Sequence, residues 1–150
     1  SSFPEQANGI IYNIEIKYQP KWDGLLCPDR ETFLSLFIKE VEDLGISDQT
    51  ILQCFDAEIL RMAHAKDVPF ELAYLVQNLK SFSRNIDRLG FVPSYYSPYF
   101  KMVKRRTMRK ASEMGVKVVP WTVNKPKDIE KKISFTGSSR VEKFFRLVDA

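Results

Sequence analysis

Residues 10–17 read Ile10-Ile11-Tyr12-Asn13-Ile14-Glu15-Ile16-Lys17, an apolar run that carries an acid and a base two positions apart near its end. Side chains alternate between the two faces of a β-strand, so the run predicts a strand with Asn13, Glu15 and Lys17 on one face. Ile14 and Ile16 then lie on the other face. Two opposite charges on one face belong either to a solvated edge or to the mouth of a site. The rest of the chain decides between these interpretations.

Size and composition are those of one globular domain: 150 residues, 44% hydrophobic, with a net charge of +4. No stretch approaches the roughly 18 consecutive apolar residues of a membrane span, and no basic segment with a hydrophobic run opens the chain, so we expect a soluble protein. Cys27 and Cys54 lack metal-ligand spacing and are interpreted as buried free thiols. The mild positive charge favours an anionic ligand. Nothing in the sequence indicates a cellular compartment.

Helical and extended patterns alternate after the first strand. Asp29 is placed to cap a helix whose apolar residues recur from Phe33 to Leu44, and Gly45 follows where a C-terminal cap would lie. Further along, the pattern predicts strands over 50–55, 70–76 and 116–122 and an extended segment over 91–96. Between them it predicts a helix from Asp56, a helix over 82–89 closed by Gly90, and a helix over 98–114 ended by Gly115.

This order of strand and helix, repeated about five times, is typical of an α/β fold. The strands are apolar on both faces, as in parallel sheets that are covered by helices. We therefore predict parallel (β/α) units with a site at the carboxyl ends of the strands. No linker divides the chain, so we expect one domain over 1–150. In residues 128–150 no strand can be recognised, and we interpret them as a divergent C-terminal tail.

Charged, amide and aromatic residues follow the ends of three predicted strands. They are Glu15 and Lys17, then Gln53, Phe55 and Asp56, then Trp121, Thr122 and Asn124. A carboxylate supplies a hard oxygen ligand to Mg²⁺ or Ca²⁺, and a lysine offers a point charge to a phosphate, so the set fits phosphate-ester chemistry. Apolar rings at the same edge would accommodate the carbon skeleton of a small alcohol.

Five short motifs resemble, in this order, those of the glycerophosphodiester phosphodiesterase family, which folds as a TIM barrel. They are Asn13-Ile-Glu-Ile-Lys17, Gln53-Cys-Phe-Asp56 (where the family more often has Ser in the second place), Tyr74-Leu-Val76, Tyr96-Ser-Pro98 and Pro120-Trp-Thr-Val-Asn124. The resemblance covers roughly residues 10 to 127. It implies metal-dependent hydrolysis of a glycerophosphodiester to glycerol 3-phosphate and an alcohol.

The same resemblance implies a role for each matching residue. Glu15 resembles a ligand of the family's divalent cation, Mg²⁺ or Ca²⁺, and Lys17 resembles its phosphate-contacting lysine. Gln53, Phe55 and Trp121 resemble residues of the pocket around the glycerol moiety. From the residues themselves, an ordinary salt bridge between Glu15 and Lys17 and a structural role for Gln53 and Phe55 remain open.

The chain also departs from the family's pattern. The family's general acid/base histidine lies in a His-Arg-Gly motif on its first strand, with further acidic metal ligands and a second histidine shortly after, and none of these motifs precedes Glu15. The one histidine, His64, falls in a predicted helix, where we expect a helix-surface or partly buried residue. The family's closing Gly-Val-Asp-Gly strand has no convincing counterpart either.

We therefore expect an incomplete barrel without its first strands and its last. Within the chain we assign no catalytic residue, and we expect the cation to be incompletely liganded and hydrolysis by the chain alone to be poor or absent. An unclosed parallel sheet leaves an edge and a face uncovered, which predicts a homo-oligomer or a need for the missing half of the barrel.

Two other classes of function remain open. One is a non-catalytic module that binds phosphate or polyols. The other is a protein that binds an anionic surface or a nucleic acid through a basic run, Lys101, Lys104, Arg105, Arg106, Arg109 and Lys110. Positions 104 and 105 face differently from 106 and 109 on a helix, and aromatic residues for base stacking are not interleaved, so we expect no nucleic-acid partner.

Overall fold

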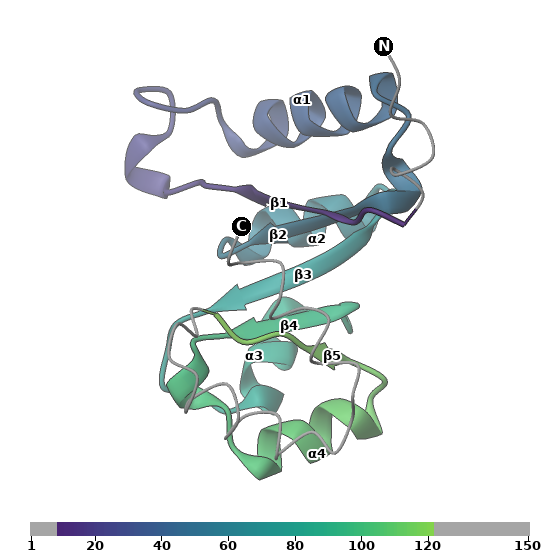
Figure 1. The fold of residues 1–150 in the computed structure, drawn as a ribbon. Helices are drawn as coiled ribbons and strands as arrows, with labels where there is room; N and C mark the ends of the chain where they lie inside the picture. Colours follow the sequence, from purple (N-terminus) through teal and green to yellow (C-terminus); the bar gives the residue numbers. More distant parts are fainter. Residues whose placement is uncertain (1–8, 122–150) are drawn as a thin grey trace. The chain divides into compact units, whose positions relative to one another are not determined.

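The computed structural model describes residues 9–121 and shows a five-stranded sheet whose strands follow the order of the chain, with helices alternating between them (Figure 1). The strands are β1 (Tyr12–Ile16), β2 (Thr50–Cys54), β3 (Glu71–Val76), β4 (Tyr95–Pro98) and β5 (Lys117–Val118). The α-helices are α1 (Arg30–Asp43), α2 (Ala57–Ala65), α3 (Phe82–Leu89) and α4 (Arg105–Glu113), and the 3-10 helices are η1 (Pro20–Trp22), η2 (Ser47–Gln49) and η3 (Phe100–Met102). The predicted α/β fold of parallel strands is confirmed.

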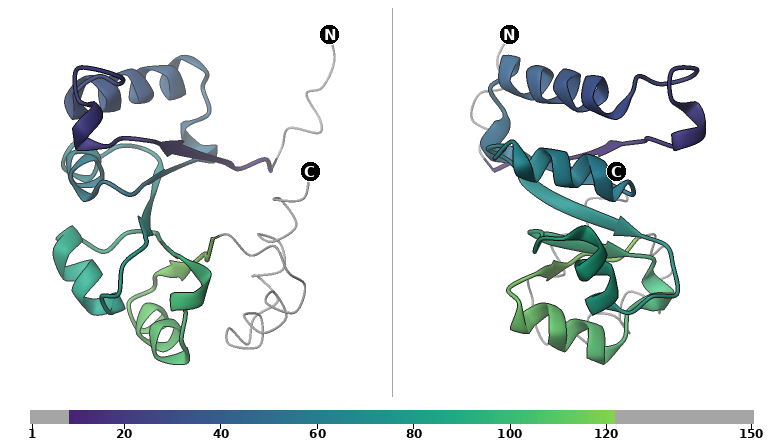
Figure 2. Two further views of the ribbon diagram at one scale, coloured as in Figure 1. Left: turned by 90° about the vertical axis from the view of Figure 1, so that its left-hand side faces the viewer. Right: turned by 180° about the vertical axis from the view of Figure 1, so that it is seen from behind.

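The chain divides into two compact units, residues 1–73 and 74–150, with the boundary inside β3 (Figure 2). In the first unit β1 and β2 pair in parallel, with Tyr12 opposite Thr50 and Ile16 opposite Cys54. The core of this unit is formed by fully buried aliphatic side chains of β2 and of the two helices, together with Phe37, which meets the edge of Phe70 with ring centroids 5.5 Å apart. These side chains are Leu34, Val41, Ile51, Leu52, Ile59, Leu60 and Ala63.

In the second unit β4 and β5 pair in parallel, with Tyr95 opposite Lys117 and Tyr96 opposite Val118. The buried face of α3 supplies Phe82, Ile86 and Leu89 to the core, and the Phe82 ring stands edge-on to Tyr96 at 4.9 Å between centroids. Asn85, on the same face, is also fully buried. All four residues of β4 are buried, as expected of a parallel strand covered on both faces.

Side-chain caps set the helix boundaries that the sequence predicts. The carboxylates of Asp29 and Asp56 accept hydrogen bonds from the backbone N–H groups of Thr32 and Ile59 and thereby begin α1 and α2. At the end of α1, Gly45 has a φ of +64° and its N–H donates to the Glu42 oxygen, while the Ile46 N–H donates to the Val41 oxygen. This pair of bonds is a Schellman motif, which requires a left-handed residue at the glycine. Gly115 closes α4 in the same way.

The predicted helix over 98–114 is wrong in its first half. Pro98 is buried at the end of β4, and the backbone N–H groups of Tyr99 and Phe100 donate to the carbonyl oxygens of Val76 and Trp121 at 3.0 and 2.8 Å. Because strand ends occupy these donors, the chain makes only the short η3, and α4 begins at Arg105.

The outer ends of two predicted strands are also corrected. The extended segment over 91–96 pairs only from Tyr95, and the strand over 116–122 is reduced to β5 and an isolated bridge at Trp121. Thr122, Asn124 and the tail over 128–150 lie outside the described residues.

Candidate functional site

Glu15 and Gln53 lie side by side at the carboxyl ends of β1 and β2. They are register partners in the parallel pair, and neighbouring partners of parallel strands point to the same face. The Asn13 side chain, two residues before Glu15, donates to Oε1 of Gln53 at 3.2 Å, which shows that the two amides share a face. The structure thus brings together Asn13 and Glu15, which strand alternation places on one face, and Gln53, which the sequence places at the same end of the next strand, whereas Ile16 is buried.

Lys17 and Phe55 each follow the last residue of their strand. Lys17 is exposed one residue beyond β1, and Phe55 is 41% exposed one residue beyond β2. No ion pair joins Glu15 to Lys17 among residues 9–121. We call the group Asn13, Glu15, Lys17, Gln53 and Phe55 the β1–β2 rim.

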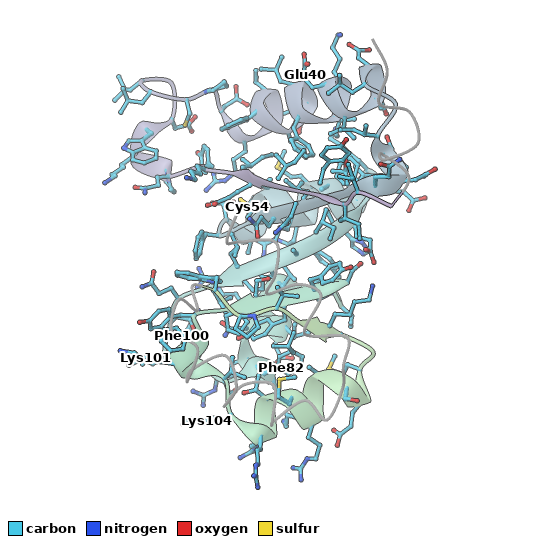
Figure 3. The ribbon with its side chains drawn as sticks, in the orientation of Figure 1. Glu40, Cys54, Phe82, Phe100, Lys101 and Lys104 are labelled. Carbon is cyan, nitrogen blue, oxygen red and sulfur yellow. The ribbon has the colours of Figure 1, made fainter. Side chains whose placement is uncertain are left out.

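Cys54 fixes the backbone beneath the β1–β2 rim. It lies at the end of β2 (Figure 3), fully buried, and its thiol donates to the Ile16 carbonyl oxygen at 3.1 Å. Its sulfur also accepts the backbone N–H of Asp56 at 3.3 Å. Burial, with smaller contributions from the carboxylates of Asp56 and Glu15, raises the pKa of the Cys54 thiol to about 12. The thiol is therefore a neutral structural group at neutral pH, and the prediction of a buried free thiol is confirmed here, while Cys27 is only half-buried.

Asp56, which follows Phe55, is engaged in structure. Besides capping α2, it accepts hydrogen bonds from Nε and Nη2 of Arg30 at 3.1 and 3.0 Å, a two-pronged ion pair between the starts of the two helices. The Arg30 guanidinium also lies over the Tyr18 ring at 4.6 Å. Burial alone would raise the pKa of Asp56, but the hydrogen bonds from Arg30 and from the Ile59 N–H outweigh it and lower the pKa. This carboxylate therefore stays ionised and holds the starts of α1 and α2 together.

In the second unit, an aromatic group lies at the carboxyl ends of β4 and β5. The Trp121 ring lies 5.5 Å from the Tyr99 ring, which meets Phe100 edge-on at 5.0 Å. Lys101 lies over the Phe100 ring at 5.8 Å, and both residues are labelled in Figure 3. The indole N–H of Trp121 donates to the Ser97 carbonyl oxygen at 2.9 Å. The polar atom of the half-buried Trp121 ring is therefore already bonded within the protein.

Residues 9–121 contain no group of three or more His, Cys, Asp or Glu side chains that could hold a metal ion. The β1–β2 rim offers a single carboxylate, Glu15, with the amides of Asn13 and Gln53 beside it. Mg²⁺ and Ca²⁺ take six or more oxygen ligands, usually from several carboxylates. The described residues therefore do not fit a complete divalent-cation site.

The helix wrongly predicted over 98–114 concealed two residues of the aromatic group. Tyr99 and Phe100 directly follow Tyr96-Ser-Pro98, one of the five motifs at strand ends. That position could have indicated from the sequence that they lie at the end of a strand. His64 is an exposed residue in the last turn of α2, which is one of the two positions, helix-surface or partly buried, that the sequence left open. Among the described residues, no helix has the length and apolar character needed to cross a bilayer.

A parallel α/β fold with polar and aromatic side chains at the carboxyl ends of its strands is the arrangement of barrel and doubly wound enzymes. The model of the glycerophosphoryl diester phosphodiesterase family matches residues 3–137. The chain therefore belongs to this family. No curated protein is significantly similar to the chain.

Solved structures show the same fold. A candidate glycerophosphoryl diester phosphodiesterase from Silicibacter pomeroyi is 21% identical with a TM-score of 0.72, and the match covers 83% of this chain and 44% of that one. A glycerophosphodiester phosphodiesterase from Parabacteroides distasonis is 17% identical with a TM-score of 0.60, and the match covers 91% of this chain and 56% of that one. A glycerophosphodiester phosphodiesterase from Thermotoga maritima is 19% identical with a TM-score of 0.61, and the match covers 84% of this chain and 50% of that one. These proteins are TIM barrels, and the chain spans about half of their length.

Proposed function

We propose that the β1–β2 rim is part of a phosphodiesterase site that takes glycerophosphodiesters. The observation that carries the proposal is the register of Glu15 with Gln53, one residue before each strand ends, in a chain that belongs to the glycerophosphoryl diester phosphodiesterase family. Active sites of parallel (β/α) barrels are built at this end of the strands.

Each residue of the rim has a role that its chemistry supports. The Lys17 ammonium, exposed one residue past β1, binds the phosphate as a point charge. Glu15 supplies one oxygen ligand to a divalent cation, Mg²⁺ or Ca²⁺, and no group of three or more His, Cys, Asp or Glu side chains among residues 9–121 completes the site. The Gln53 amide and the Phe55 ring contact the glycerol moiety. Trp121 is not a member of the rim; its role as a further residue of the glycerol pocket is proposed from the family resemblance alone, and its N–H is already bonded to Ser97.

The activity of the 150-residue chain alone follows from what it lacks. The family's histidine motifs have no match in the sequence, and general acid–base catalysis is typically worth about 10²- to 10⁴-fold in rate. We propose that the chain by itself binds glycerol phosphates and hydrolyses glycerophosphodiesters poorly or not at all. The single carboxylate of the rim favours the related alternative, a phosphate- or polyol-binding module without catalysis.

Calorimetric titration with glycerol 3-phosphate, in the presence and absence of Ca²⁺, tests this binding. We expect Lys17→Met to weaken binding by about tenfold, the equivalent of one charge-assisted contact. Glu15→Gln should remove whatever enhancement Ca²⁺ produces. Lys39→Met is the matched control: Lys39 is an exposed lysine of α1 that pairs with Asp43, and this variant should bind as the wild type does. Equal affinity of the Lys17→Met and Lys39→Met variants would contradict the proposal.

A turnover assay separates binding from catalysis. The 150-residue chain is incubated with glycerophosphocholine and Mg²⁺ or Ca²⁺, and choline release is followed. We expect release to stay far below the rates of about 1 s⁻¹ or more that are typical of enzymes. Metal-dependent turnover at such rates would show that the chain contains a complete site.

A further inference from the structure

The loop that joins β1 to α1 carries two exposed leucines. Leu25 is 82% exposed and Leu26 is 79% exposed, and they are adjacent in the chain. Figure 1 shows this loop extending outward from the end of β1, past η1, before it returns to α1. Loops normally expose polar residues, so two adjacent leucines exposed to this degree indicate a surface that contacts something apolar.

The backbone of the loop is hydrogen-bonded within itself. The Trp22 carbonyl oxygen accepts the N–H groups of Leu25, Leu26 and Cys27 at 3.0, 2.9 and 3.2 Å. The Gly24 N–H donates to the Cys27 carbonyl oxygen at 3.0 Å, and Gly24 has a φ of +67°, which permits this tight turn. All four N–H groups from Gly24 to Cys27 are therefore paired inside the loop. Unpaired backbone donors are very costly in hydrocarbon, so this pairing lowers the cost of bringing the turn to a lipid surface. The carbonyl oxygens of Gly24, Leu25 and Leu26 accept none of these bonds, so they would have to stay hydrated among the lipid headgroups.

The residues beside the leucines suit the boundary between water and lipid. Trp22 is half-buried, and the Lys21 ammonium lies 5.4 Å from the centroid of its ring. Tryptophan and lysine gather at membrane interfaces because each combines an apolar body with a polar end.

Charge indicates which kind of lipid surface fits. Lys17 and Lys21 are exposed on this side, but so are Asp23 and Asp29, and the Asp29 carboxylate accepts hydrogen bonds from Thr32. Positive and negative charges balance, so electrostatic attraction to an anionic surface contributes little. Contact would depend on the leucines and would be nearly insensitive to salt.

We propose that this loop docks the chain on a phospholipid surface by inserting Leu25 and Leu26 among the lipids. The neighbours of the leucines favour lipid over a second protein surface, because Trp22 and the Lys21 ammonium over its ring are residue types that gather at membrane interfaces. Docking brings the β1–β2 rim close to lipid, since η1 begins three residues after Lys17. The inference is independent of the phosphodiesterase site and is tested without any measurement of hydrolysis.

Sedimentation with vesicles tests the docking. The 150-residue chain is mixed with vesicles of phosphatidylcholine alone and of phosphatidylcholine with one fifth phosphatidylglycerol, and the bound fraction is measured at low and high salt. We expect both vesicles to bind the wild type with partition coefficients within about threefold of each other, because the loop carries balanced charge. The double variant Leu25→Ser, Leu26→Ser should reduce the partition coefficient by about tenfold or more.

The matched control is the double variant Leu36→Ser, Leu44→Ser. These leucines are 50% and 66% exposed on α1 and at its C-cap, and α1 carries them away from the loop. This variant should bind vesicles as the wild type does. A second variant, Leu26→Trp, should bind at least as tightly, and its fluorescence emission should shift to the blue on addition of vesicles.

Three results would overturn the proposal. In the first, the wild type leaves both vesicles unbound; in the second, the loop and control variants bind equally well. Size-exclusion chromatography could also show that the loop variant converts a dimer to a monomer while vesicles have no effect, which would assign the leucines to a second copy of the chain instead.

Discussion

The Cys54 thiol donates a hydrogen bond to the Ile16 carbonyl oxygen at 3.1 Å, and thereby joins the last residue of β2 to the last residue of β1. The same sulfur accepts the Asp56 N–H, so it also holds the first turn of α2. A serine hydroxyl can make both bonds, which gives a physical reason why the related motif more often carries serine.

We expect Cys54→Ser to change the free energy of unfolding by less than about 1 kcal/mol, whereas Cys54→Ala should cost about 2 kcal/mol because it leaves a buried donor and acceptor unpaired. Urea denaturation of the two variants checks this. Equal stability of the serine and alanine variants would show that the two hydrogen bonds contribute nothing. Cys27→Ser is the control, since Cys27 is half-buried and its substitution should be nearly neutral.

The Arg30–Asp56 ion pair predicts a specific loss of stability in acid. The pKa of Asp56 is lower in the folded chain, so its contribution is present above the unfolded pKa of about 4 and is lost as the pH falls through the folded pKa. Asp56→Asn keeps a capping side chain but removes the charge. Thermal unfolding between about pH 6 and pH 2 should show a smaller acid-induced decrease in this variant than in the wild type. An equal acid-induced decrease in the unfolding temperatures of the variant and the wild type would contradict this role of the ion pair.

Asn85 on α3 is a buried polar residue whose side chain is satisfied by hydrogen bonds. Its amide donates to the Tyr96 hydroxyl at 2.9 Å, and its carbonyl oxygen accepts the Asn78 side chain at 3.0 Å. We expect Asn85→Leu to destabilise the chain by about 2–4 kcal/mol, because two polar partners lose a buried hydrogen bond. Chemical denaturation measures this, and Asn78→Ala, at the half-buried end of the network, should cost less.

The start of α4 is poorly capped, and this can be improved. Lys104 is the N-cap residue without a side-chain hydrogen bond, and Arg105 and Arg106 follow it with no acid in the first turn. Positive charge at this end opposes the helix dipole. Lys104→Asp should therefore stabilise the chain by about 1 kcal/mol, and Lys104→Ala by much less. Urea midpoints for the two variants would contradict this explanation if they were identical.

Local chemistry in the sequence was sufficient for most of the fold. Asp29 and Asp56 mark helix starts, and Gly45, Gly90 and Gly115 mark helix ends, because caps depend on side-chain oxygens and left-handed backbone that are visible in single residues. The helix predicted over 98–114 failed because the N–H groups of Tyr99 and Phe100 bond to Val76 and Trp121, which are distant in sequence.

The candidate site was predictable to a similar degree. Strand alternation placed Asn13 and Glu15 on a common face, the strand-end argument placed Gln53 near them, and the register of β1 with β2 agrees. The engagement of Asp56 by Arg30, 26 positions away, and the aromatic partners of Trp121 depend on tertiary contacts, and no periodicity reveals such contacts. The roles of Glu15, Lys17, Gln53, Phe55 and Trp121 toward a ligand remain predictions.

The location of the ligand is the central claim, and a ¹H–¹⁵N correlation spectrum of the chain titrated with glycerol 3-phosphate tests it most directly. We expect the largest shift changes at the amides of Glu15, Lys17, Gln53 and Phe55, and we expect them to disappear in the Lys17→Met variant. Shift changes confined to the basic run from Lys101 to Lys110 would place the anion on α4 and contradict the account.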